Sequence, residues 1–279
     1  MTTVYPLVFR IGTFEITGFG ILMMLAFLVG GWLVTLELRR RGWNQDYSTD
    51  IVFAAVIGGV IGAKLWFVAL TGDLDALLSR GGLVWYGGFL GGVLAVIING
   101  WRRRVPMRIT AHLVAPALAA AYAVGRVGCF VVGDDYGRPT DLPWGVKFPQ
   151  GLPPSTAGNL SGMFGVPVPE GAAPTQVLAV HPTQLYEVLL MTAAFMVLWR
   201  WRTKEKPLGW LFGAYLMFAG IERFLVEILR AKDDRFLGAF TIAQLTSLAI
   251  VLVGAIVVTK LGKGSDPEPG EYLTATAGG

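Results

Sequence analysis

Four ionisable side chains stand together directly after an apolar run, residues 110–124, that is long enough to lie mostly in lipid. They belong to the glycine-rich segment GRVGCFVVGDDYGRPT, residues 125–140, and are Arg126, Asp134, Asp135 and Arg138. A charged group inside hydrocarbon costs roughly 2.5–3.5 kcal/mol on insertion scales. The glycines let the backbone approach another backbone or a ligand closely. We therefore predict a functional site here; a solvated loop between helices is the alternative.

A second charged pair occurs in a later apolar segment. Arg223 and Glu227 are four residues apart and so share one helix face. Such residues inside a membrane normally face the protein interior and pair with each other or with a substrate. Arg223 and Arg126 both lie toward the ends of their segments that are predicted to face the outside. A guanidinium group offers a planar fork to phosphate oxygens. This pattern favours a phospholipid ligand, the alternative being an ion pair that only ties helices together.

The composition indicates a membrane protein. The chain has 279 residues, of which 54% are hydrophobic and 15% charged, with a mean hydropathy of +0.58, whereas soluble domains carry about 25% charged residues. One cysteine and two histidines make a multi-cysteine metal site or a zinc centre improbable. Neither a nucleic-acid footprint nor a nucleotide-binding glycine loop is seen. We expect no metal, no cofactor and no nucleic-acid partner.

Seven apolar segments approach the roughly 20 residues that cross a bilayer. They predict an all-α polytopic membrane protein of about seven transmembrane helices, at residues 16–38, 50–70, 83–100, 110–125, 181–201, 207–229 and 237–259. The long segment 126–180 is rich in Gly and Pro and predicts a small, irregular extracytoplasmic head. We divide the chain into a transmembrane domain, 1–262, and a disordered cytoplasmic tail, 263–279.

The basic residues predict the orientation, because cytoplasmic loops are enriched in Lys and Arg. Loops after the first, third and fifth segments and the C-terminal tail carry them: Arg39–Arg41, Arg102–Arg104, Arg108, Arg200, Arg202, Lys204, Lys206, Lys260 and Lys263. All lie on one side if the N-terminus is outside. We expect the N-terminus outside and the C-terminus in the cytoplasm.

Three further features leave alternatives open. The pairs Gly87-Gly88 and Gly91-Gly92 favour close helix packing over an acyl-chain groove. His181 before Pro182 favours a helix cap over a catalytic base. Glu222 points about 100° away from Arg223 and is expected to pair elsewhere, for instance with Lys64.

Taken together, GRVGCFVVGDDYGRPT, HPTQLYE (residues 181–187) and RFLVE (residues 223–227) resemble the bacterial phosphatidylglycerol–prolipoprotein diacylglyceryl transferases over residues 11–260. The resemblance implies that the diacylglyceryl group of phosphatidylglycerol moves to the lipobox cysteine of a prolipoprotein signal peptide, and that glycerol phosphate leaves. Membrane lipid and signal peptide are then the partners. A thiolate must attack, and positive charge must stabilise the departing phosphate.

The same resemblance implies roles for residues of the motifs. Arg126 and Arg223 match the essential arginines of the family, Asp134 a usually acidic position, and Glu227 a residue that orients Arg223. Tyr86 stands where a histidine is often proposed as the base. Substrate binding is assigned to Gly87, Gly88, Tyr136, Gly137, Arg138, His181, Gln184 and Glu187.

The departures from the family pattern put the base in question. Tyrosine has a pKa near 10 and is a poor base unless an arginine lies beside it. Phe19 replaces a familiar tyrosine and loses its hydroxyl. The alternatives are therefore a divergent paralogue that is inactive or uses another acceptor at the same lipid site, and a small-solute membrane transporter.

Overall fold

The computed structural model describes residues 2–12, 14–77, 82–232, 235–237, 240–261 and 266–275. A long helix lies at each of the seven predicted segments. These helices are α1 (Gly18–Arg40), α2 (Asp46–Thr71), α3 (Trp85–Arg102), α4 (Met107–Val132), α6 (Thr183–Trp201), α7 (Trp210–Glu227) and α8 (Ile242–Leu261). The prediction of a mostly helical protein is confirmed.

Four of these helices are long and apolar enough to cross a membrane. They are α1, α2, α4 and α8, with mean hydropathies of 2.2, 2.2, 1.6 and 2.3 over their most apolar windows. α7 is 18 residues long and carries Glu222, Arg223 and Glu227. The fold is thus that of a membrane protein.

α4 is longer than its apolar run and reaches seven residues further than the predicted end at 125. It ends at Gly133, whose φ of 71° lies in the left-handed region, where glycine is favoured because it has no Cβ. The amide of Gly133 donates to the carbonyl oxygen of Cys129 at 2.9 Å. Arg126 therefore stands inside the helix and not in the following loop, which corrects the predicted boundary.

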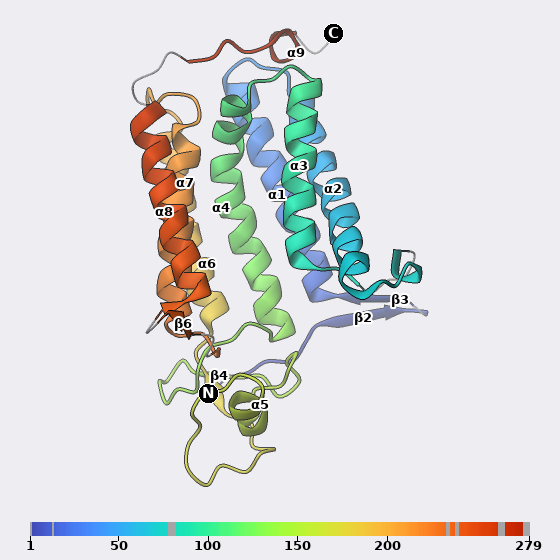
Figure 1. The fold of residues 1–279 in the computed structure, drawn as a ribbon, viewed down its shortest axis with the longest axis vertical. Helices are drawn as coiled ribbons and strands as arrows, with labels where there is room; N and C mark the ends of the chain where they lie inside the picture. Colours follow the sequence, from blue (N-terminus) through green and yellow to red (C-terminus); the bar gives the residue numbers. More distant parts are fainter. Residues whose placement is uncertain are drawn as a thin grey trace.

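The helices form two groups on either side of α4 (Figure 1). α1 packs on α4, and α2 pairs with α3, while α6 contacts α4 and α7 pairs with α8. A Cβ atom at Gly87 would lie 2.3 Å from the carbonyl oxygen of Gly62, and one at Gly91 would lie 2.3 Å from that of Gly58. These glycines let α2 and α3 approach closely, as the packing interpretation predicts.

The segment between α4 and α6 forms a small packed unit at the same end as the N-terminus (Figure 1). It contains β4 (Val146–Lys147), α5 (Ala157–Gly162) and β5 (Ala179–Val180); β4 lies between β5 and the N-terminal β1 (Thr2–Thr3). β1 and β4 are parallel, and β4 and β5 are antiparallel. Phe148, Leu160 and Val180 are fully buried. The segment is mostly irregular in secondary structure, as expected, and scattered apolar residues give it a packed core that the Gly and Pro content conceals.

Two hairpins flank the helices. β2 (Val8–Ile11) and β3 (Phe14–Thr17) are antiparallel and precede α1, whose first turn is capped by the Thr17 side chain, which accepts from the amide of Gly20 at 3.1 Å. β6 (Arg235–Leu237) and β7 (Phe240–Thr241) join α7 to α8. A short 3₁₀ helix, η1 (Asp75–Leu77), follows α2.

The described part of the C-terminal tail, residues 266–275, packs across the end of the bundle opposite the head (Figure 1). It ends in α9 (Glu271–Thr274), where Leu273 is fully buried. The Tyr272 hydroxyl donates to Asp50 at 2.6 Å, and the Asp266 carboxylate accepts from the amide of Leu208 at 2.7 Å. Residues 266–275 thus bury an apolar side chain and satisfy backbone groups of the bundle.

Candidate active site

Three helix ends meet beside the head: the C-terminal turns of α4 and α7 and the N-terminal turns of α6. Together with residues 133–140 they gather the side chains of both sequence motifs. Arg126 comes from α4, Glu187 from α6 and Arg223 from α7. Segments separated by about a hundred residues of sequence therefore build one charged cluster.

Arg126 is held by carboxylates from two sides. Its guanidinium forms an ion pair with Glu187 and a second with Asp135, at 3.0 Å from Nη1 to Oδ2. The same Nη1 lies 3.3 Å from the sulfur of Cys129. The side chain of Glu187 is 1% exposed and that of Arg126 11%. The pair is buried, and its geometry is therefore fixed before any ligand arrives.

Arg223 is oriented by Glu227 but keeps a free donor. Its Nη2 lies 2.6 Å from Oε2 of Glu227, while Nη1 is buried and has no hydrogen-bond partner in the described part of the chain. Glu227 is in turn held by the Thr241 hydroxyl, which donates to Oε1 at 3.2 Å. An unpartnered buried guanidinium nitrogen is costly, so this donor is available for an anionic group.

Arg230 joins the two halves of the cluster. Its guanidinium pairs with Asp135, and its Nε lies 3.9 Å from Oε2 of Glu227. Asp135 adopts a left-handed backbone conformation, with φ of 55°, and its carboxylate lies between Arg126 and Arg230. Burial alone would raise the pKa of Asp135, but the two guanidinium groups hold it below its usual range. Asp135 is therefore a bridging anion at neutral pH.

Asp134 differs from its neighbour. Its side-chain Oδ1 is buried without a hydrogen-bond partner among the described residues. Burial, followed by the adjacent Asp135 charge, raises the pKa of Asp134 to about 6. Its backbone carbonyl accepts from Gln184, which is fully buried on the first turn of α6. Gln184 thus positions the loop.

A backbone frame holds the loop after α4 against the end of α7. The amide of Gly137 donates to the His181 carbonyl at 2.8 Å, and the amide of Arg138 donates to the Leu229 carbonyl at 2.8 Å. A Cβ at Gly137 would lie 2.5 Å from the Leu229 oxygen. The Arg138 guanidinium Nε donates to the Arg230 carbonyl at 3.2 Å. Gly137 and Arg138 therefore position Arg230 through the backbone.

The other predicted residues of these motifs contact the head. The Tyr136 ring is buried and stacked on Phe148, and its hydroxyl donates to the Pro153 carbonyl at 2.8 Å. His181 Nδ1 lies 3.2 Å from the Tyr186 hydroxyl. Burial lowers the pKa of His181, so the ring is mainly neutral at pH 7.

Tyr86, Gly87 and Gly88 lie on the first turn of α3. The Tyr86 side chain is 65% exposed and meets Trp85 edge to face at 5.2 Å between ring centroids. Gly87 contacts α2 as described, and a Cβ at Gly88 would lie 3.5 Å from the Gly59 carbonyl oxygen. The structure gives these two glycines a packing role, and none of the three takes part in the ion pairs around Arg126 described above.

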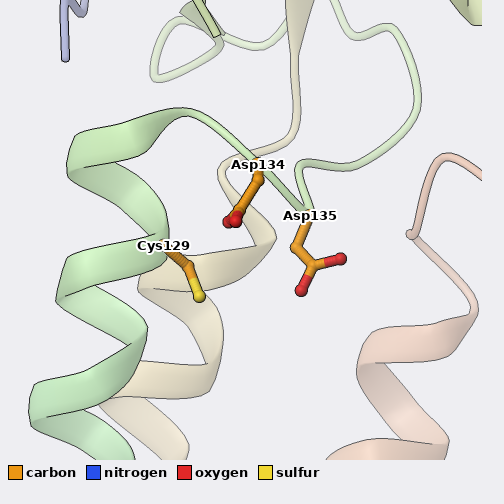
Figure 2. A group of neighbouring side chains, drawn as sticks. All are labelled: Cys129, Asp134 and Asp135. Atoms are coloured by element: carbon orange, nitrogen blue, oxygen red, sulfur yellow. The ribbon is translucent and has the colours of Figure 1, made fainter. Parts of the chain in front are cut away.

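Figure 2 shows a group of side chains that could offer ligand atoms to a cation: Cys129, Asp134 and Asp135. The candidate ligand atoms lie within 4.8 Å of one another. However, the Arg126 guanidinium contacts both the Cys129 sulfur and the Asp135 carboxylate, and Arg230 pairs with Asp135. Two guanidinium groups already neutralise this group, which favours an anion-binding over a cation-binding interpretation.

Sequence reasoning assigned no role to Arg230 or Tyr122, and it included Asp135 in the charged segment without a specific role. The Tyr122 hydroxyl donates to Glu187 at 3.3 Å, and its ring centroid is 5.9 Å from the Arg126 guanidinium carbon. Spacing could have indicated two of the three, because Tyr122 precedes Arg126 by one helical turn and Arg230 follows Glu227 by three residues. The bridging position of Asp135 depends on its left-handed backbone and is not readable locally.

Comparison with known proteins shows the family of the chain. The sequence model of the prolipoprotein diacylglyceryl transferase family matches residues 6–260. The chain belongs to this family. Proteins named phosphatidylglycerol–prolipoprotein diacylglyceryl transferase are similar over nearly their whole length. The protein of Geobacter sulfurreducens is 31% identical, covering 91% of this chain and 95% of the relative, and that of Cupriavidus metallidurans is 32% identical, covering 91% and 92%.

A more distant relative of the same name, from Clostridium tetani, is 28% identical over 90% of this chain and 96% of its own. Membership in the transferase family confirms the resemblance drawn from the three motifs. Arg126, Glu187, Arg223 and Glu227, which those motifs contribute, are the residues that the fold brings into one cluster.

Proposed function

We propose that the protein transfers the diacylglyceryl group of phosphatidylglycerol to the lipobox cysteine of prolipoproteins and releases glycerol phosphate. One observation carries the proposal: Arg126, Arg223 and Arg230 gather at one end of the bundle, and a buried nitrogen of Arg223 has no partner among the described residues. Family membership supplies the reaction class, since the named relatives carry that activity in their names.

The chemistry requires the charges that this cluster provides. A thiolate displaces a phosphate ester at carbon, so negative charge develops on the departing phosphate oxygen. Guanidinium groups that are already oriented stabilise that charge without reorganisation, which is the largest contribution in many enzymes. Glu227 holds Arg223 in place, and Glu187 and Asp135 hold Arg126. In this proposal Asp134 and the motif residues of the loop keep the arginines at the lipid headgroup.

The proposed topology places this end of the bundle at the extracytoplasmic headgroup level of a bacterial cytoplasmic membrane. Seven spans, an outside N-terminus and a cytoplasmic C-terminus put the clustered Arg and Lys residues of the loops inside. The segment between α4 and α6 then lies outside, where the signal peptides of prolipoproteins emerge and where the outer leaflet presents phosphatidylglycerol.

A transfer assay tests the proposal. Purified protein, phosphatidylglycerol and a lipobox peptide are incubated in detergent, and the mass of the peptide is measured by mass spectrometry. We expect a diacylglyceryl adduct on the cysteine and free glycerol phosphate. Arg223→Gln should lower the rate by roughly 10²–10³-fold, as expected for one oriented charge donor, whereas Arg102→Gln, an exposed arginine at the other end of the bundle, should not.

Absence of the adduct with folded, lipid-binding protein would refute the assignment and point to a paralogue with another acceptor. Equal rates for the two arginine variants would refute the phosphate-binding role of Arg223. Phosphatidylglycerol binding by each variant, measured in parallel, separates lost affinity from lost chemistry.

A further inference from the structure

We infer that Glu222 is the base that takes the proton from the lipobox cysteine thiol, an inference that rests on the proposed function. The reaction needs a thiolate, and the residue at the position of the family's proposed base, Tyr86, is a phenol on an exposed part of α3. A carboxylate inside the arginine cluster would supply what Tyr86 lacks.

Glu222 is buried and incompletely satisfied. The residue is 5% exposed, and its Oε1 is buried without a hydrogen-bond partner in the described part of the chain. A polar group without a partner costs free energy on folding, and a buried carboxyl group costs more when charged. A free oxygen of this kind is available to accept a proton.

The position of Glu222 on α7 directs it toward the site. A Cβ at Gly220 would lie 2.7 Å from the Ser247 carbonyl oxygen, so that face of α7 is turned to α8. Glu222 follows Gly220 by two residues, which corresponds to a rotation of about 200° around the helix axis. Glu222 therefore points away from α8. Leu211 and Tyr215, eleven and seven residues earlier, share its face and belong to the apolar cluster between α4, α6 and α7. Glu222 therefore lies at the polar end of the α7 face that carries Leu211 and Tyr215.

The surroundings of Glu222 are the catalytic cluster itself. Its carboxyl interacts electrostatically with Glu187 on α6, with Arg126 on α4, and with Arg223 and Arg230 at the end of α7. The hydroxyls of Tyr122 and Tyr215 also interact electrostatically with the Glu222 carboxyl group. The arginines compensate the charge of a carboxylate at this position.

The other carboxylates of the cluster have partners. Glu187 accepts from Tyr122 and pairs with Arg126, Glu227 pairs with Arg223, and Asp135 bridges two arginines. Asp134 has a free oxygen but lies beside Cys129 in the loop after α4 (Figure 2). Oε2 of Glu227 also lacks a hydrogen bond but pairs with Arg223, so Glu222 is the carboxylate within the helices whose buried oxygen has neither a hydrogen bond nor an ion pair among the described residues.

The step balances as follows. The S–H bond of the peptide cysteine breaks, and its proton goes to Oε1 of Glu222. The electron pair of the sulfur forms a C–S bond to the glyceryl carbon. The bond from that carbon to the phosphate oxygen breaks, and its electron pair leaves with glycerol phosphate beside Arg126 and Arg223. Glu222 then returns its proton to water.

The test compares Glu222→Gln with the wild type over pH 6–9.5, using phosphatidylglycerol and a lipobox peptide. A general base contributes roughly 10²–10⁴-fold, so at pH 7 we expect kcat to fall about 100-fold or more with an unchanged KM for the lipid. The deficit should shrink below about tenfold at pH 9.5, because the peptide thiol, with a pKa near 8.5, then ionises without help. Glu205→Gln, an exposed glutamate between α6 and α7, is the matched control.

The outcomes separate the two proposals. A wild-type protein that forms no adduct refutes the transferase function and this inference with it. An active wild type whose E222Q variant keeps its rate within threefold at pH 7, or loses the same factor at every pH, refutes only the role of Glu222. The same signature in Asp134→Asn instead would assign the base to Asp134. If E222Q is misfolded, Glu222→Ala decides: formate should restore its rate at least tenfold, and no restoration overturns the inference.

Discussion

Charge removal at the buried pair of Arg126 and Glu187 should destabilise the protein strongly, and removal of both charges should cost little more than removal of one. Breaking a buried ion pair from one side costs about 3–5 kcal/mol, because the remaining charge is uncompensated. In Glu187→Gln, Asp135 still contacts Arg126 at 3.0 Å, which places that variant near the lower limit. In Arg126→Gln, Glu187 loses its ion-pair partner and keeps the hydrogen bond from the Tyr122 hydroxyl, which places that variant near the upper limit.

At roughly 2–4 °C per kcal/mol for chains of this size, the single variants should unfold about 6–20 °C below the wild type in detergent. The double variant should match the milder single variant within a few degrees, since neighbouring charges are not additive. Glu15→Gln, in the exposed pair with Arg10, should cost less than about 1 kcal/mol. The unfolding temperatures of the four variants and the wild type are measured in detergent. If the decrease in the double variant equals the sum of the decreases in the two single variants, the coupling between Arg126 and Glu187 is refuted.

Three further predictions follow from the packing and the charges. Gly87→Ala, whose Cβ would lie 2.3 Å from the Gly62 carbonyl oxygen, should lower the unfolding temperature. Gly88→Ala, whose Cβ would lie 3.5 Å from the Gly59 carbonyl oxygen, should leave the unfolding temperature within a degree or two of the wild type. Equal decreases in the two variants would contradict the packing role of Gly87. Asp134, with its pKa raised to about 6, binds more protons when folded, so its stabilising contribution is present below about pH 4 and lost as the pH rises through 6. Asp134→Asn should therefore become more stable than the wild type as the pH rises from 4 to 6 and keep that difference above it; a pH-independent difference in unfolding temperature would argue against the shift. Leu273→Ala should cost about 2–5 kcal/mol, as for a fully buried leucine, while the transfer rate below the unfolding temperature stays unchanged because the tail lies at the end opposite the site; an unaltered stability would mean that the tail does not pack as described.

The sequence by itself determined the helices and the family. Long apolar runs favour helices wherever the surroundings are lipid, because every backbone group must then be satisfied within its own segment. Each of the seven runs accordingly overlaps a long helix. The motifs around Arg126, His181 and Arg223 are contiguous in the chain, so they could be read without a structure. The pairing of Arg223 with Glu227 followed from helical spacing alone.

Only the tertiary structure decided which residues pair across the charged cluster, and how the head and residues 266–275 pack. Asp135 meets Arg230, which is 95 residues away, because a left-handed residue turns the chain toward the end of α7. The core of the head and the docking of Leu273 depend on apolar residues that show no helical or strand period in the sequence. Hydropathy and spacing are local properties, whereas the burial of Glu222 and the position of its free oxygen arise from the packing of α4, α6 and α7 around it.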